Sequence, residues 1–311
     1  MHAPSVDFPS FPPDGNIVNL ANLAVPSSYS QLKIVDLIQE KINAREYFYG
    51  IEISPGLQQV LNYNLLKVAP LFTSIVWLAS HNWAMESLDE APAVRLAKRV
   101  EPNGPVLAHI SCYNLTYDKL RKFLKPSINN VMVVRGDDVD EGQQYRHAAD
   151  LVREIRKIRK DDICISVGGY PEGHPESTSM EDDLKFLKSK VDAGADLIIT
   201  QLTFNEEALI EFIKSCRKIG ITIPIVPGIY VPKSWAGLKF VSEKTHVKPP
   251  EELYVQYESR KHNQTEFREF AVQQAVKMIH SLFESDLGIY GVQFFTLNYF
   301  KNVYNIVQQV M

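Results

Sequence analysis

The chain has 311 residues, 45% of them hydrophobic and 23% charged, which suits a globular protein with one large barrel or two ordinary domains. A net charge of −4 excludes a general electrostatic attraction to nucleic acid or to an anionic membrane. Its three cysteines are scattered and no apolar run approaches the ~20 residues of a membrane span, so we expect a cytoplasmic protein without a disulfide framework, a membrane partner or a nucleic-acid partner.

The first part of the chain is rich in proline. Residues 1–30 mix prolines with Ser and Asn, and we expect an N-terminal extension that lies over the surface or is partly disordered. The first Lys or Arg of the chain is Lys33, which disfavours a signal or transit peptide. Apolar spacing over Ser30–Ala44 then predicts a helix that closes the bottom of the fold that follows.

From Tyr47 onward, strand-like and helix-like segments alternate. The predicted strands are short and apolar and cover Tyr47–Ile53, Phe72–Leu78, Pro105–Ser111, Asn130–Val134, Ile163–Val167, Leu197–Thr200, Ile223–Pro227 and Gly291–Phe295. The predicted helices cover Leu57–Ala69, Ala91–Val100, Tyr117–Phe123, Gln143–Arg159, Met180–Ala193, Glu206–Lys218, a longer helical region over Pro232–Phe283, and Phe300–Val310. Eight such units predict an α/β fold, a (β/α)8 TIM barrel that forms a single domain over residues 31–311. No Gly-x-Gly-x-x-Gly joins a strand to a helix, which disfavours a doubly wound dinucleotide-binding sheet.

The active site of such a barrel lies at the carboxyl ends of its strands. Polar or aromatic residues stand at nearly every one of these ends: Glu52, Trp77, His109, Arg135 with Asp137, Tyr170 and His174, Gln201, Tyr230, and Phe295-Thr296 with Asn298. This recurrence predicts a ligand site rather than a purely structural barrel.

The segment Asn130–Asp137 is the most informative of these ends. A buried apolar strand breaks there into Arg135-Gly136-Asp137, and the glycine lets the backbone turn or come close to a ligand. Two other interpretations stay open, a surface ion pair and an integrin-binding tripeptide, of which the second needs an exposed loop of an extracellular protein. The neighbouring strand ends favour a ligand site.

Glu52 lies near the end of the first barrel strand. Alternation puts Phe48, Gly50 and Glu52 on one face of this strand and an all-apolar set on the other. If the apolar face meets the helices, Glu52 points into the barrel mouth, where apolar surroundings raise its pKa toward the range of a general acid. The alternative is a solvated or Lys-paired carboxylate.

Three further features fit a bound cofactor or substrate. The loop Gly168–Glu176 combines glycines, prolines and a histidine, so a flat or phosphorylated ligand can approach its backbone. Asp183 and Lys190 share one face of the next helix and suit a hydroxyl and a phosphate, although a solvated stripe is a common alternative. Gln201 offers an amide that donates and accepts in one plane, which suits a heterocycle; alternatively, it satisfies loop backbone.

Taken together and in this order, these segments resemble the catalytic barrel of methylenetetrahydrofolate reductase from about Tyr47 to the C-terminus. The blocks that carry the resemblance are Val134–Asp137, Gly169–Glu176, Lys190–Asp196, Ile199–Gln201 and Pro224–Ile229. The resemblance implies a barrel that holds FAD and passes a hydride from NADPH or NADH to the flavin and then to 5,10-methylenetetrahydrofolate, giving 5-methyltetrahydrofolate. The regulatory domain that follows the barrel in long eukaryotic forms is expected to be absent.

The resemblance also implies roles for single residues. Glu52 takes the place of the catalytic acid that helps to open the methylene bridge, and Asp137 that of the carboxylate that tunes the flavin potential. Cofactor-contacting positions correspond to His109, Arg135, Gly136, Asp137, His147, Ala148, Tyr170, His174, Asp183 and Lys190. Substrate-contacting positions correspond to Glu52, Gln201, Trp235 and Asn298, and no metal site is implied.

Several of these positions depart from the family pattern. Val76 replaces a Thr that works with the acid, His147 replaces a flavin-contacting Tyr, and Phe186 replaces a polar flavin contact. Thr203 removes an aromatic ring, and Tyr299 stands where the family has an Arg. Val cannot hydrogen-bond, and Tyr cannot replace a cation.

Two hypotheses therefore stay open. The first is an FAD-dependent methylenetetrahydrofolate reductase whose partners are small molecules. The second is a non-catalytic or weakly active folate- or flavin-binding paralogue that acts as the partner of an active subunit. The choice between NADPH and NADH and the formation of a homo-oligomer also stay open, since barrel helices offer several apolar faces.

Overall fold

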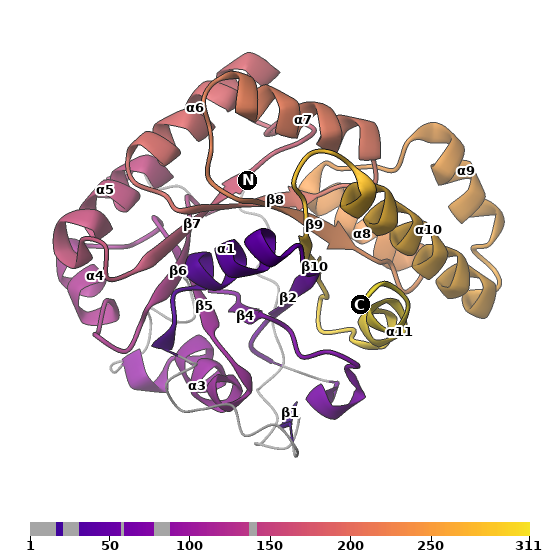
Figure 1. Ribbon diagram of the computed structural model, residues 1–311, viewed down its shortest axis with the longest axis horizontal. Coiled ribbons are helices and arrows are strands. Elements are labelled where there is room, and N and C mark those ends of the chain that lie inside the picture. Colours follow the sequence, from indigo (N-terminus) through magenta and orange to yellow (C-terminus); the bar gives the residue numbers. More distant parts are fainter. Residues whose placement is uncertain (1–16, 21–30, 57–58, 78–87, 137–141) are drawn as a thin grey trace.

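The computed structural model describes residues 17–20, 31–56, 59–77, 88–136 and 142–311. Eight parallel strands close into a barrel in the order β10-β2-β4-β5-β6-β7-β8-β9 (Figure 1). These strands are β2 Phe48–Ile53, β4 Phe72–Ile75, β5 Val106–Ser111, β6 Asn130–Val134, β7 Cys164–Gly169, β8 Leu197–Leu202, β9 Ile225–Tyr230 and β10 Gly291–Phe295. The prediction of a (β/α)8 barrel is confirmed.

Helices surround the barrel (Figure 1). They are α3 Pro92–Val100, α4 Tyr117–Phe123, α5 Ala148–Arg159, α6 Met180–Asp192, α7 Glu206–Lys218, α8 Trp235–Thr245, α9 Glu251–Ser259, α10 Gln264–Glu284 and α11 Lys301–Val310. Polar side chains that accept a backbone N–H fix where several of them begin, as Ser179 does at α6 and Asn205 at α7. The helical region predicted over Pro232–Phe283 proves to be three helices, and the helix predicted from Gln143 begins only at Ala148.

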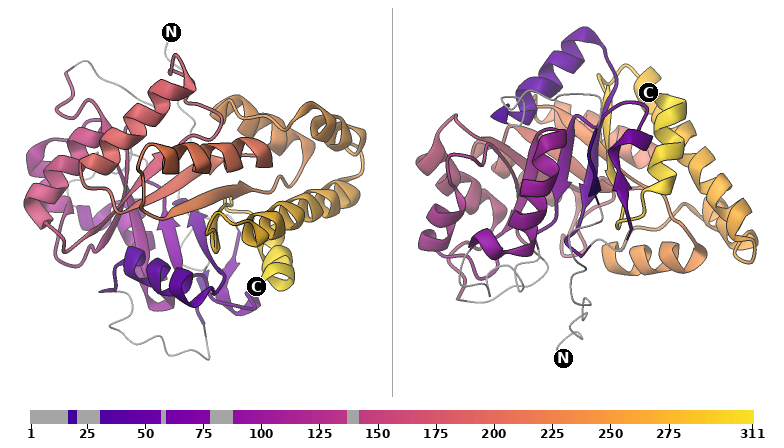
Figure 2. Two further views of the ribbon diagram at one scale, coloured as in Figure 1. Left: turned by 45° about the horizontal axis from the view of Figure 1, so that its top comes forward. Right: turned by 90° about the horizontal axis from the view of Figure 1, so that it is seen from below.

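Helix α1, Ile34–Ala44, closes one end of the barrel. Ile34, Leu37 and Ile38 are buried in one cluster with inward-facing residues near the amino-terminal ends of the strands, such as Phe48 and Leu107. Figure 1 shows α1 lying across the barrel, and the right view of Figure 2 shows it on the side opposite α8. The plug predicted from the sequence is confirmed, so a ligand reaches the interior from the carboxyl ends of the strands.

The helix predicted over Leu57–Ala69 is wrong for the part of it that the structure describes. Leu61–Asn62 forms strand β3, which pairs in parallel with strand β1, Ile17–Val18, and a 3-10 turn follows at Tyr63–Leu65. Asn62 caps that turn by accepting from the Asn64 N–H. The backbone hydrogen bonds of this segment therefore go to a distant partner, which apolar spacing along the segment does not reveal.

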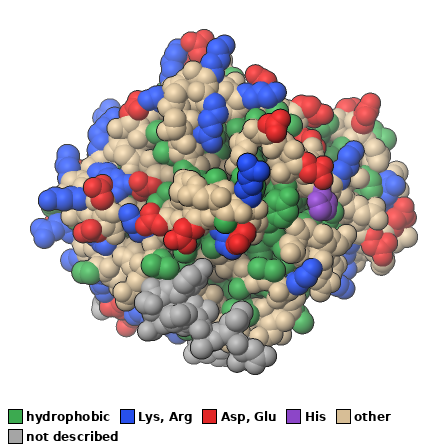
Figure 3. Space-filling view, viewed as in Figure 1, with side chains coloured by type: hydrophobic (Ala, Val, Ile, Leu, Met, Phe, Trp, Pro, Cys, Tyr) green, Lys and Arg blue, Asp and Glu red, His purple; other side chains and the backbone are tan. Residues whose placement is uncertain are grey.

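The surface of the α1 face carries mixed charge. Lys and Arg side chains are interspersed there with Asp and Glu (Figure 3), in keeping with the net charge of −4. None of the helices in the described ranges is long and apolar enough to cross a membrane.

Candidate active site

The alternation of strand β2 places Glu52 inside the barrel. Tyr49, Ile51 and Ile53 are buried in the cluster between the sheet and the helices, so the neighbouring Glu52 points toward the barrel axis. The Glu52 side chain is 12% exposed, and burial raises its pKa to about 8. The carboxyl group therefore keeps its proton at neutral pH, which is the state of a general acid.

The loop after strand β10 fixes the backbone around Glu52. The Thr296 hydroxyl donates to the Glu52 carbonyl oxygen over 2.6 Å. Asn298 clamps Ser54: its Oδ1 accepts from the Ser54 N–H at 2.9 Å, and its Nδ2 donates to the Ser54 carbonyl oxygen at 3.1 Å. Asn298 has a φ of 60°, a left-handed conformation that Asn tolerates. Its amide thus holds the strand end that carries Glu52.

His109 and Ser74 lie beside the Glu52 carboxyl. His109 Nε2 is 3.9 Å from Glu52 Oε2 and 2.6 Å from Ser74 Oγ. Burial lowers the pKa of His109 to about 4, so an uncharged imidazole stands beside an uncharged carboxylic acid at neutral pH. Ser74 was not predicted as a site residue. The sequence feature that could have indicated it is a hydroxyl residue at an inward-facing position near the end of a strand.

A cavity of about 300 Å³ opens between strands β6 and β7 and helices α5 and α6. It is lined by most of the residues predicted to contact a cofactor: Arg135, His147, Ala148, Tyr170, His174, Asp183 and Lys190. Gly136 follows Arg135 with a φ of 93°, a conformation that favours glycine, and a Cβ there would lie 3.2 Å from that of Ser111. The barrel therefore gathers residues from four separate segments into one cavity.

Lys190 is a partly buried cation of this cavity. Its Nζ donates to the Gly168 carbonyl oxygen at 2.6 Å and lies 5.7 Å from the centre of the Tyr170 ring. Burial lowers the pKa of Lys190 to about 8, and the Asp183 charge opposes that shift. Asp183 also accepts a hydrogen bond from the backbone N–H of His174, which holds the loop after β7 against α6.

A second cation lies at the edge of the same cavity. Arg135 Nη1 is 2.5 Å from Glu176 Oε2, and this contact lowers the pKa of Glu176. The cavity thus holds two cations, Lys190 and Arg135, together with the carboxylates of Asp183 and Glu176, and an ammonium and a guanidinium are the groups that bind a phosphate.

Two of the departures from the family pattern lie face to face here. The His147 and Phe186 rings stack with centroids 6.3 Å apart and an interplanar angle of 24°. Phe186 is 57% exposed although it is a large apolar side chain, and it lines the cavity. A flat ligand ring therefore has an aromatic surface available at this edge.

Two other residues predicted to contact the substrate make local contacts within the protein. Gln201 Oε1 accepts from the Leu202 N–H at 2.9 Å, as its backbone alternative predicts. The Trp235 ring packs on Tyr254 of helix α9 with centroids 5.0 Å apart. Asp137 lies outside the described residues.

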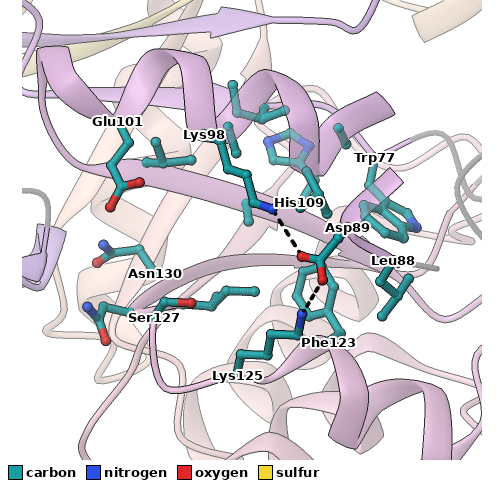
Figure 4. A pocket seen from close by; sticks show the side chains of 18 of the residues that line it. Trp77, Leu88, Asp89, Lys98, Glu101, His109, Phe123, Lys125, Ser127 and Asn130 are labelled. Atoms are coloured by element: carbon teal, nitrogen blue, oxygen red, sulfur yellow. Dashed lines mark hydrogen bonds and ion pairs between the residues drawn. The ribbon is translucent and has the colours of Figure 1, made fainter. Parts of the chain in front are cut away.

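A second cavity of about 300 Å³ lies between the outer face of the barrel and helices α3 and α4 (Figure 4). Trp77 and Phe123 stand on one side of it, and Asp89 reaches between Lys98 and Lys125 at its mouth (Figure 4). Of the strand-end residues singled out from the sequence, it contains Trp77 and His109. Within the described ranges, no group of three His, Cys, Asp or Glu residues is placed to hold a metal ion.

Comparisons with known proteins place the chain in a family. The family model of methylenetetrahydrofolate reductase matches residues 38–311. Methylenetetrahydrofolate reductase (NADH) 1 of Arabidopsis thaliana is 30% identical over 307 residues, which cover 90% of this chain and 51% of that protein. The 5,10-methylenetetrahydrofolate reductase of Salmonella typhimurium is 30% identical over 268 residues, which cover 84% of this chain and 88% of that protein.

A solved structure shares the fold. The chain aligns with an uncharacterized protein from Clostridium thermocellum that binds two copies of 5-methyl-5,6,7,8-tetrahydrofolic acid, with a TM-score of 0.64, 15% identity, and 88% and 98% of the two chains covered. The chain spans about half the length of the plant and fission-yeast reductases it matches. Both the extent of the family match and the identity to the bacterial enzyme show that this chain belongs to the methylenetetrahydrofolate reductase family.

Proposed function

We propose that the protein reduces 5,10-methylenetetrahydrofolate to 5-methyltetrahydrofolate with NADPH or NADH, with Glu52 as the acid. The observation that carries this proposal is the buried Glu52 carboxyl, whose pKa of about 8 keeps it protonated at neutral pH. Opening the methylene bridge requires a proton on the departing amine nitrogen, and Glu52 holds one at the barrel axis. The methylene carbon then takes a hydride, and the nicotinamide supplies those two electrons.

The residues around the α5–α6 cavity fit a flavin dinucleotide. Lys190 and Arg135 suit its phosphates, Asp183 suits a ribose or ribityl hydroxyl, and the His147–Phe186 pair suits a flat ring. FAD bound there would carry two electrons from the nicotinamide to the folate. We assign Asp137 to the flavin as well, by its place next to Arg135 and Gly136 in the sequence.

Folate as the substrate is supported by the family and by the fold. The relatives include methylenetetrahydrofolate reductases named for NADH and one named for NADPH. The Clostridium thermocellum protein of the same fold binds 5-methyl-5,6,7,8-tetrahydrofolic acid. We assign Gln201 and Trp235 to the folate or the nicotinamide, and Asn298 to holding Glu52 in place. A cytoplasmic location and the domain boundary at residue 31 are part of the same proposal.

A second function is favoured by the departures at the site. Val76 follows strand β4 directly, and its backbone N–H donates to the Ile53 carbonyl oxygen at 3.0 Å, so this residue lies next to the strand that carries Glu52. A valine there removes a hydroxyl that the family has. The second function is a folate- or flavin-binding paralogue with little or no turnover, acting as the partner of an active subunit.

Anaerobic turnover separates the two functions. The purified protein is loaded with FAD and mixed with 5,10-methylenetetrahydrofolate and either NADPH or NADH. The reductase predicts bleaching of the flavin absorbance and formation of 5-methyltetrahydrofolate. Flavin binding without product from either nicotinamide would establish the paralogue instead.

A further inference from the structure

The hydroxyl of Ser74 has a single partner in the described part of the chain. Ser74 is 1% exposed, and its Oγ lies 2.6 Å from His109 Nε2. A serine hydroxyl carries one hydrogen, and a buried donor without an acceptor costs roughly 1–3 kcal/mol. The Ser74 hydroxyl therefore donates to His109 Nε2, which fixes Nε2 as the acceptor nitrogen of a neutral imidazole and leaves the ring proton on Nδ1.

The same nitrogen is the ring atom that faces Glu52. His109 Nε2 is 3.9 Å from Glu52 Oε2, and both side chains are nearly buried, with 13% and 12% exposed. A small rotation of either side chain would bring these atoms into hydrogen-bond contact, and a free Nε2 lone pair would then accept the Glu52 proton. Ser74 already occupies that lone pair.

We propose that Ser74 is a positioning residue that protects the acid, because its hydrogen bond to His109 Nε2 prevents this nitrogen from taking the proton of Glu52. The inference rests on the proposed role of Glu52 as the acid. Strand pairing places the parts in register: Ser74 on β4 is the direct partner of Glu52 on β2, and His109 follows on β5. The three side chains thus converge from three adjacent strands.

Other groups around Glu52 do not perform this task. From β10 the neighbouring inward residue is Phe295, and beyond it Tyr230 of β9 has a pKa raised by burial. Among the described residues, burial alone raises the pKa of Glu52, with no charged neighbour contributing. The state of the Glu52–His109 pair therefore depends on which hydrogen bond Nε2 makes.

The variant Ser74→Ala tests the inference by the plateau of its pH profile. Transfer of the Glu52 proton to a freed Nε2 leaves the number of protons on the pair unchanged, so kcat for folate reduction on the plateau below the alkaline limb should fall several-fold, and the limb itself should move up rather than down. Ser74→Thr keeps the hydroxyl and should keep the plateau value of kcat. Ser166→Ala is the matched control, because Ser166 is an equally buried inward serine that, among the described residues, has no hydrogen-bond partner; its plateau value of kcat should not change.

Imidazole nitrogen NMR gives a readout that needs no turnover. With His109 assigned by His109→Gln, the parent protein and Ser74→Thr should show a neutral ring with an unprotonated Nε2 at pH 7. Ser74→Ala should show a protonated Nε2. A His109 signal that is the same in Ser74→Ala and the parent would overturn the inference whether or not the protein reduces folate. A parent protein with the expected tautomer but no folate reduction would overturn the proposed function alone.

Discussion

The Glu52 carboxyl and the His109 imidazole lie 3.9 Å apart inside the barrel, and burial moves their pKa values in opposite directions, to about 8 and about 4. Each group is therefore uncharged at neutral pH. An uncharged acid can give its proton to a substrate nitrogen, whereas an ion pair between the two groups could not do so as readily.

This relationship predicts how activity depends on pH. The active form of Glu52 is the protonated one, so kcat for folate reduction should be flat below a pH of about 8 and fall tenfold for each further pH unit. Reduction of the flavin by NADPH does not use the Glu52 proton, so its rate should not fall in this pH range. The role of Glu52 as the acid would be contradicted if both half-reactions fell together above a pH of about 8, or if folate reduction fell already near the ordinary pKa of a glutamate.

Lys190→Met should weaken FAD binding by about tenfold or more, because it removes the ammonium that can bond to a phosphate while keeping much of the side-chain volume. Lys188→Met is the matched control, since Lys188 lies on the same helix and pairs with Asp192. Titration of the apoprotein with FAD, followed by flavin fluorescence, measures both. Equal affinities of the two variants would remove Lys190 from the cofactor site.

Asn298→Gly tests the clamp on the strand end. Glycine also tolerates a positive φ, so this change removes the two hydrogen bonds to Ser54 without adding backbone strain. The free energy of unfolding in urea should fall by about 1–3 kcal/mol. Asn305→Ala on the exposed side of helix α11 should change it by less than about 0.5 kcal/mol. Unchanged stability of Asn298→Gly would show that the clamp does not hold the strand.

Val76→Thr should raise folate turnover several-fold, because it restores a hydroxyl beside the strand of Glu52 at almost the same side-chain volume. The rate of flavin reduction by NADPH serves as the internal control and should not change. A variant with no gain in folate turnover would show that this position limits neither step.

Much of the fold was readable from the sequence because its signals are local. The bounds of helix α7, Glu206–Lys218, and of strand β6, Asn130–Val134, were predicted as observed, since buried apolar runs and capping residues mark them. The segment around Leu61 was predicted as a helix because its partner, Ile17–Val18, is more than 40 residues away along the chain. Its pairing has no local signature.

The site, like the fold, has features that the sequence predicts and features that it does not. The inward direction of Glu52 follows from strand alternation, and its high pKa follows from burial, so both could be predicted. The bond between Ser74 and His109 joins residues 35 positions apart on different strands, and only the stagger of the closed barrel brings them together. The stack of His147 on Phe186 likewise joins two departures that look unrelated in the sequence.

The most direct test of Glu52 as the acid is stopped-flow measurement of the two half-reactions in Glu52→Gln. The amide keeps the size of the side chain but has no proton to give at neutral pH. Flavin reduction by NADPH should keep its parent rate, while reoxidation by 5,10-methylenetetrahydrofolate should be lost. Loss of both half-reactions together, or reoxidation at the parent rate, would contradict the role of Glu52 as the acid.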